Sequence, residues 1–259
     1  MKGDEVRVHI KEFLTPSNLW NTLVAKNRIS KYIVPILQDC IDKNNIKIYY
    51  EPFVGGANLI DKIHCKERIG NDIHPQLIAM FNELQKGWQP PSHISEDEYN
   101  KVRENKELYS DYYVGYVGFN STFGAKYFGG YARGFKADKI TPRDISNEAY
   151  RNLMKQMPQI TDVSFLCSDY KNNKYCDLEN ALIYCDPPYQ DTTKYATDTF
   201  DHEEFWNWCR KMSKYNKVFV SEYNAPDDFD CIWSKQVTTS LKVHEHEDRT
   251  EKLFTYSEE

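Results

Sequence analysis

The stretch with the clearest chemical potential is Asp186-Pro187-Pro188-Tyr189, which directly follows an apolar run at residues 181–185. An ionised Asp and a proline carbonyl both accept hydrogen bonds, and proline has no N–H of its own to compete. Two prolines fix φ near about −65°, so the acceptors are in place before a ligand arrives. The motif therefore predicts a rigid pair of acceptors beside an aromatic ring.

Such a pair suits an exocyclic amino group on a nucleobase, for example N6 of adenine. The lone pair of that nitrogen is delocalised into the ring, so a catalyst must accept hydrogen bonds from both N–H groups and favour a tetrahedral nitrogen. Tyr189 offers a face on which a base taken out of a duplex can stack. The alternative interpretation is a rigid turn after a strand, with Asp186 as its cap.

A second group of candidate binding residues surrounds Gly55 and Gly56, which end a β-branched and aromatic run. Two glycines let the backbone approach a ligand closely at the mouth of a sheet. Asp72 lies at the end of the next predicted strand, 16 residues beyond Gly56, near the offset at which an acidic residue commonly accepts hydrogen bonds from a ribose. The alternatives are an ordinary strand-to-helix turn at the glycines and a helix N-cap at Asp72, before Pro75.

These residues need elements that bring them together, and hydrophobic spacing predicts those elements. Helices are expected at residues 29–42, 57–63, 76–84 and 202–215, and strands at residues 46–53, 67–73, 163–167, 181–185 and 218–221. Alternation of this kind favours an α/β fold, with a sheet of mainly parallel strands and helices on both faces.

The alternation is interrupted after residue 85. Residues 86–160 are polar, aromatic and helical in pattern, with glycines between residues 115 and 134. We interpret them as an inserted, mainly helical domain. The catalytic domain is then discontinuous and consists of residues 1–85 and 161–259.

Composition limits the possible classes of protein. The chain has 259 residues, of which 40% are hydrophobic and 28% charged, and its apolar runs are too short to cross a bilayer. Residues 1–12 lack the pattern of a signal peptide. The chain has seven cysteines and no Cys-x-x-Cys pair, which indicates reduced thiols. His244-Glu245-His246 could bind a metal, but the sequence shows no third ligand for it. We expect a cytoplasmic protein without a metal.

The motifs, taken in order, resemble those of the Dam-like DNA adenine methyltransferases. The resemblance is carried by Lys26, Phe53-Val54-Gly55-Gly56, Asn71-Asp72-Ile73, Cys167-Ser168-Asp169-Tyr170, Asp186-Pro187-Pro188-Tyr189 and Ser221-Glu222-Tyr223. It implies a Rossmann-like methyltransferase sheet that binds S-adenosylmethionine at the glycine turn, which includes Phe53.

The resemblance also assigns individual roles in the cofactor site. Asp72 is expected on the ribose of the cofactor, the region of Asp169 near its adenine, and Lys26 and Asp186 beside its methionine end. The chain reads Thr22-Leu23-Val24-Ala25 before Lys26, where family members carry an aromatic residue and a glycine-containing step. The alternative for Lys26 is a surface lysine.

Residues 118–134 look like the part with which family members engage DNA. The net charge is −6, so DNA binding requires a local basic patch, and residues 126–143 hold five basic residues against one acid. The candidate DNA-binding residues are Asn120, Ser121, Lys126, Tyr131, Arg133 and Lys136. The alternative is a glycine-rich loop whose aromatic residues pack inward.

Together these observations predict an enzyme that flips an adenine out of double-stranded DNA and methylates its N6 atom at specific sites. The alternatives are a methyltransferase of related fold that acts on RNA or protein, and a DNA-binding module with a decayed cofactor site.

Overall fold

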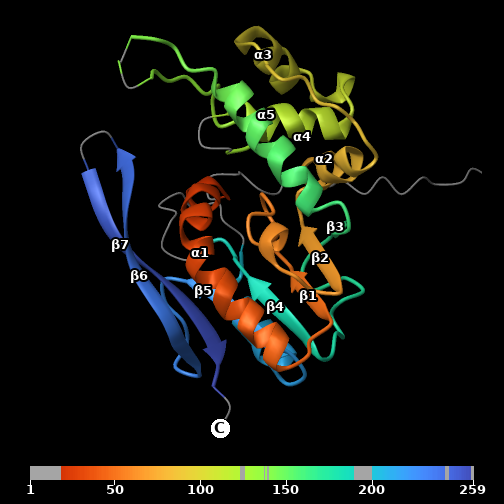
Figure 1. Ribbon diagram of the computed structural model, residues 1–259, viewed down its shortest axis with the longest axis vertical. Coiled ribbons are helices and arrows are strands. Elements are labelled where there is room, and N and C mark those ends of the chain that lie inside the picture. Colours follow the sequence, from red (N-terminus) through yellow and green to blue (C-terminus); the bar gives the residue numbers. More distant parts are fainter. Residues whose placement is uncertain are drawn as a thin grey trace, which may run out of the picture.

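A single mixed sheet forms the centre of the protein (Figure 1). The computed structural model describes residues 19–122, 126–136, 138, 140–189, 200–242 and 245–257, with residues 19–28 and 237–249 as backbone alone. The order of the strands in this sheet is β3-β2-β1-β4-β5-β7-β6. The strands are β1 (Ile48–Glu51), β2 (Glu67–Asp72), β3 (Ser164–Cys167), β4 (Ala181–Cys185), β5 (Lys217–Glu222), β6 (Phe229–Lys242) and β7 (Glu245–Tyr256).

Strands β1 to β5 run parallel, and β7 and β6 add an antiparallel hairpin at one edge. Successive side chains of a strand point to opposite faces of the sheet, and both faces of the parallel strands are buried. In β4, Leu182 and Tyr184 enter one core while Ile183 and Cys185 enter the other. Helices α1 (Leu19–Lys43) and α2 (Pro75–Gln85) cover the first face, and α6 (His202–Ser213) covers the second.

The helices α3 (Glu96–Glu104), α4 (Asp111–Asn120) and α5 (Ile145–Gln156) gather with α2 at one end of the sheet (Figure 1). Helix α4 crosses α2 so closely that a Cβ atom at Gly115 would lie 2.1 Å from the backbone oxygen of Gln76. Val114, Tyr116 and Val117 of α4 belong to the same hydrophobic core as α1 and α2. The segment 86–160 therefore shares its core with the sheet, and its status as a separate domain stays a prediction.

Most of the elements predicted from the sequence are present. The five predicted strands and the helices at residues 29–42, 76–84 and 202–215 are confirmed, although α1 begins at Leu19. The helix predicted at residues 57–63 is wrong, since a 3-10 turn spans only Ile60–Lys62. Ala57 explains the difference because its φ of 56° is left-handed and cannot continue a right-handed helix.

Two further observations concern the described part of the chain. None of its helices is both long and apolar enough to cross a bilayer. All seven cysteines are free thiols, as their spacing predicts.

Candidate active site

The candidate site lies where the strand order reverses. From β1 the chain continues to β2 on one side, whereas β4 occupies the other side, with Tyr50 of β1 opposite Ile183 of β4. In open α/β sheets ligands bind at such a point, beyond the carboxyl ends of the strands. Glu51 and Asp186 stand at these two ends, so the glycine turn and the Asp186 motif lie at the same edge of the sheet.

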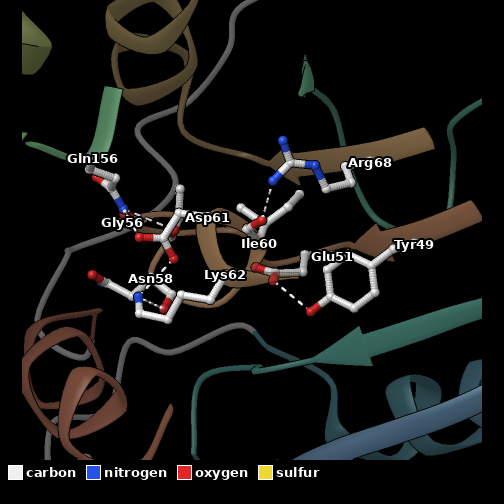
Figure 2. Close-up of polar contacts among 10 residues, drawn as sticks. Tyr49, Glu51, Gly56, Asn58, Ile60, Asp61, Lys62, Arg68 and Gln156 are labelled. Atoms are coloured by element: carbon white, nitrogen blue, oxygen red, sulfur yellow. Dashed lines mark hydrogen bonds and ion pairs between the residues drawn. The ribbon is translucent and has the colours of Figure 1, made fainter. Parts of the chain in front are cut away.

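Glu51 is a deeply buried acid of the site, with 2% of its surface exposed. Its carboxyl accepts a hydrogen bond of 2.7 Å from the Tyr49 hydroxyl (Figure 2). Burial, together with a smaller effect of the nearby carboxyl groups of Asp61 and Asp186, raises the pKa of Glu51 to about 8, against the lowering effect of the Tyr49 hydroxyl. Glu51 is thus mainly a neutral acid near pH 7, poised to ionise beside a positive ligand.

The glycine turn is tied to the end of β2 by Asp72. Gly55 has a left-handed φ of 48°, and its N–H donates to Oδ2 of Asp72 at 3.1 Å. Oδ1 of Asp72 accepts from the N–H of His74 at 2.9 Å, while His74 itself is the N-cap residue of α2. Asp72 is therefore not that N-cap, and its carboxylate keeps lone pairs for a further donor. Burial raises the pKa of Asp72, and the backbone N–H groups of His74 and Gly55 oppose this shift.

Asn71 joins the ends of three neighbouring strands. Its completely buried side-chain amide donates to the carbonyl oxygens of Pro52, at 3.1 Å, and Ser168, at 2.9 Å. Its own oxygen accepts from the Ser168 hydroxyl at 2.6 Å. These contacts hold the loops after β1, β2 and β3 in one fixed arrangement.

The other predicted cofactor residues lie around this edge. Phe53 packs its ring against Tyr170, with 5.1 Å between the centroids. Asp169 follows β3 and accepts a hydrogen bond of 3.0 Å from the N–H of Lys171. Lys26 belongs to α1, but its side chain lies outside the described residues.

The Asp186 motif is held from the hairpin side of the sheet. Pro187 is buried, and Tyr189 is 5% exposed, with its hydroxyl donating to Glu251 of β7 at 2.9 Å. The ring of Tyr189 meets that of Tyr223 edge-on, with 4.6 Å between centroids. Burial raises the pKa of Tyr189 well above its ordinary value. In this arrangement the ring is a packed wall, so stacking on a base requires a movement that uncovers it.

Several candidate DNA-binding residues are placed within the helical segment. Ser121 is completely buried, 3.4 Å from the hydroxyl of Ser146, and therefore has a packing role in this structure. Tyr131 donates to the carbonyl of Ile94 at 2.8 Å, and Asn120 contacts the sulfur of Met80 at 3.5 Å.

The basic candidates are more accessible. Arg133 is exposed and forms a bidentate pair with Glu96, in which Nε lies 3.1 Å from the carboxylate. Lys136 is exposed and Lys126 is partly exposed.

Beyond Arg133 the chain forms a finger, described at residues 134–136, 138 and 140–143; the sequence analysis predicted the basic charge of this stretch but not its exposed apolar residues. Phe135 bridges to Pro142, and the N–H of Lys136 donates to the carbonyl of Thr141 at 2.8 Å. Phe135 is 61% exposed and Ile140 80% exposed, beside basic residues. Apolar residues in a stretch rich in Lys and Arg are the signal that could have revealed this finger.

Other site residues were also missed. Glu51 could have been found, because it is an ionisable residue at the end of an apolar run. Glu251 and Gln156, which contacts the glycine turn, gave no local signal. Within the described residues no group of three or more His, Cys, Asp or Glu is arranged to hold a metal, and the side chains of His244-Glu245-His246 lie outside them.

Known proteins similar to this chain include the Type II methyltransferase M.FokI of Planomicrobium okeanokoites. It is 22% identical over 239 residues, which cover 85% of this chain and 34% of that protein. The chain thus spans about a third of the length of that relative.

Two solved structures match the chain at low similarity. The methyltransferase yhhF of Escherichia coli has a TM-score of 0.37 and 8% identity, covering 92% of this chain and 86% of its own. The magnesium protoporphyrin IX methyltransferase ChlM of Synechocystis PCC 6803 has a TM-score of 0.37 and 9% identity, covering 95% and 87%.

A family model matches most of the chain, residues 30–251. This range contains the glycine turn, Asp72, the finger and the Asp186 motif. The model describes the D12 class N6 adenine-specific DNA methyltransferases, and the chain belongs to this family.

Proposed function

We propose that the protein transfers a methyl group from S-adenosylmethionine to N6 of adenine in double-stranded DNA. The observation that carries this proposal is the position of Asp186-Pro187-Pro188-Tyr189 at the reversal of the sheet, beside the end of β1 and its glycine turn. An acceptor pair and a cofactor turn at one edge are what transfer to an amino group requires.

The residues at the strand ends fit this cofactor. When bound, S-adenosylmethionine supplies an electrophilic methyl group on a positively charged sulfur. Carboxyl groups at the ends of β1, β2 and β4, those of Glu51, Asp72 and Asp186, suit a ligand of positive charge. We assign the ribose to Asp72, the turn to Phe53, Gly55 and Gly56, the region of the cofactor adenine to Asp169, and the methionine end to Lys26 and Asp186.

The chemistry of the target amino group belongs to Asp186 and the carbonyl of Pro187. Both accept hydrogen bonds from the N–H groups and so orient the nitrogen lone pair toward the methyl group. The nitrogen becomes acidic only as it acquires positive charge, so Asp186 accepts its proton late and needs no raised basicity. Pro188 keeps the turn rigid, and Tyr189 forms the adjoining wall.

On the DNA side we assign the segment 86–160 to target recognition, and residues 1–85 and 161–259 to catalysis. Arg133, Lys126 and Lys136 supply positive charge for phosphate or base contacts. Phe135 and Ile140 at the finger offer apolar surface of the kind that wedges between bases. Their exposure supports the proposal, because a finger with no partner gains nothing from leaving such residues in water.

The decisive experiment combines purified protein, labelled S-adenosylmethionine and DNA duplexes, followed by analysis of the modified nucleosides. We expect N6-methyladenine with the wild-type protein and none with Asp186→Ala. Label in cytosine with adenine unmodified, or label only in parallel reactions that contain RNA or protein in place of DNA, would replace this proposal by one of the alternative methyltransferases. Expression in cells that lack adenine methylation then gives the recognised site.

A further inference from the structure

We propose that Gln156, the last residue of α5, is a positioning residue that holds the glycine turn in its cofactor-binding shape. Its side-chain amide donates to the carbonyl oxygens of Gly56, at 3.0 Å, and Ala57, at 2.9 Å (Figure 2). The same nitrogen lies 3.4 Å from Oδ2 of Asp61. The inference rests on the proposed function, because it takes this turn to be the cofactor site.

The backbone of the turn explains why it needs such a contact. Gly55 and Ala57 both have left-handed φ angles, of 48° and 56°. Glycine adopts this conformation freely, but a residue with a Cβ atom does so at a cost in free energy. Ala57 is also completely buried, so water does not compensate for a carbonyl left without a donor there. Gln156 supplies the donors at the strained position.

The turn is thereby fixed from two directions. Asp72 accepts from the N–H of Gly55, whereas Gln156 donates to the two carbonyls that follow. Asp61 is itself held by Lys62, whose Nζ lies 2.8 Å from Oδ1 (Figure 2). Without Gln156, the Gly55 N–H would keep its hydrogen bond to Asp72, but the carbonyl groups of Gly56 and Ala57 would lose their donor.

This contact also joins two parts of the molecule that lie 100 residues apart in sequence. Gln156 ends the last helix of the segment 86–160, which we assign to DNA recognition, and the turn belongs to the catalytic part. A shift of α5 on DNA binding therefore reaches the cofactor turn through this amide. Since coupling between two binding sites is reciprocal, cofactor binding should favour the same position of α5.

The test is the affinity for S-adenosylmethionine without DNA, measured by calorimetry on the full chain. Gln156→Met keeps the length and unbranched shape of the side chain but removes both donors. We expect the Kd to rise roughly ten-fold, as the loss of one or two hydrogen bonds predicts. At saturating cofactor the methylation rate should stay within about two-fold of wild type, because Gln156 touches no reacting atom.

A matched control is available in Gln85→Met. Gln85 likewise donates to two backbone carbonyls, those of Ile160, at 2.6 Å, and Val163, at 2.8 Å. These lie just before the amino end of β3, at the opposite edge of the sheet. This variant should lose thermal stability as Gln156→Met does, yet bind the cofactor with unchanged affinity.

A second variant gives a pH signature that a purely structural role does not predict. Gln156→Glu directs a carboxylate toward two carbonyls and Asp61, so at pH 8 it should bind the cofactor more weakly than Gln156→Met. Protonation restores one donor, and its Kd relative to that of wild type at the same pH should fall as the pH is lowered. This comparison also serves if Gln156→Met does not fold.

Each outcome separates the two proposals. If wild type binds the cofactor and the folded Gln156 variants bind it with equal affinity at every pH, the role of Gln156 is overturned and the proposed function is unaffected. Wild type that does not bind S-adenosylmethionine would overturn both.

Discussion

Two carboxyl groups at adjacent strand ends differ in their task because they differ in burial. Asp186 is partly exposed after β4, although its Oδ1 atom is buried, whereas Glu51 is 2% exposed and accepts a hydrogen bond from Tyr49. An exposed, rigidly held acceptor can orient a reacting group. A buried acid instead responds to the charge of a neighbour through its protonation.

The role of Asp186 predicts an order of activity among its variants. Asp186→Asn keeps one acceptor oxygen and should retain part of the activity, whereas Asp186→Ala leaves the amino group unheld. By analogy with the removal of other preorganised groups, we expect Asp186→Ala to be roughly 100- to 1000-fold slower. Single-turnover methylation with saturating DNA and cofactor measures this order. An alanine variant as fast as wild type would remove the motif from the active site.

Asp72 has two functions that its variants can separate. Asp72→Ala removes the acceptor proposed for a ribose hydroxyl and also the partner of the Gly55 N–H, so cofactor affinity should fall by about 1.5 to 3 kcal/mol. Asp72→Asn keeps one acceptor oxygen and should lose less. The stabilisation of each variant by cofactor, followed by thermal shift, reports the difference. If both variants are stabilised by the cofactor as much as wild type is, Asp72 serves only to hold the loop at Gly55.

Residues of the site were predictable from the sequence where a short motif follows a recognisable strand. Asp186 stands at such a position because it follows an apolar run, and Asp72 ends the short strand predicted at residues 67–73. Glu251 and Gln156 were not predictable, because their partners Tyr189 and Gly56 are 62 and 100 residues away. A contact of that span is set by the packing of whole elements and leaves no local pattern.

Among the elements, the β6–β7 hairpin contacts the Asp186 motif through a hydrogen bond from Tyr189. Glu251 of β7 accepts from the Tyr189 hydroxyl, so Tyr189→Phe and Glu251→Gln should each loosen the motif, and the double variant should cost little more than either single one. We expect the kcat of methylation to fall while cofactor affinity stays near that of wild type. Additive losses in the double-mutant cycle would show that the two residues act independently.

We assign the finger and Arg133, the residue before it, to the proposed DNA-binding surface. Arg133 pairs with Glu96 at the surface, and such pairs contribute about 0 to 1 kcal/mol to stability. Arg133 can therefore leave Glu96 and contact DNA at a small cost in free energy. Arg133→Ala should weaken DNA binding with unchanged cofactor affinity. If Arg133 reads a base, discrimination at one position of the site falls by about 1 to 3 kcal/mol, whereas a phosphate contact weakens all sequences alike.

Arg103→Ala is the control for this measurement, because Arg103 forms a similar exposed pair with Glu104 on α3. Gel-shift titrations at a fixed salt concentration suit both variants. DNA affinity equal to wild type in a folded Arg133→Ala protein would exclude Arg133 from the interface.

The elements that were missed share a physical reason. Helix α4 is buried on every side from Val114 to Phe119, so it shows no polar face and no helical periodicity. Strand β7 reads Glu-His-Glu-Asp-Arg-Thr-Glu-Lys at its start, which hides the alternation that marks a half-buried strand. The sheet order could be expected in outline from alternating helices and strands, but the hairpin at its edge could not.

At the scale of the whole molecule, the helical segment shares a hydrophobic core with one face of the sheet. Gly115 allows α4 to lie directly on α2. Because the net charge is −6, we expect a duplex to approach the protein at the basic stretch of residues 126–143.

Glu51 makes the stability of the folded protein depend on pH. Its folded pKa, raised by burial to about 8, lies above the value of 4.5 for an exposed Glu. Between these two values the folded protein keeps a proton that the unfolded chain has released, so the stability contributed by Glu51 is fully present below pH 4.5 and is lost as the pH rises through 8. His74 acts in the opposite direction, because burial lowers its pKa from 6.5 to about 4 and its contribution is lost as the pH falls through that range.

We therefore expect the free energy of unfolding of the wild-type protein, relative to that of Glu51→Gln, to fall by roughly 3 kcal/mol between pH 5 and pH 8. Glutamine keeps an acceptor for the Tyr49 hydroxyl but cannot ionise, so the difference isolates the titration. Urea unfolding at several pH values measures it, and Glu104→Gln, on the exposed surface of α3, should follow wild type throughout. Saturating S-adenosylmethionine should reduce the fall, because a positive ligand favours the ionised carboxyl and its binding then releases a proton. Parallel curves for wild type and Glu51→Gln would mean that Glu51 is ionised in the folded protein across this range.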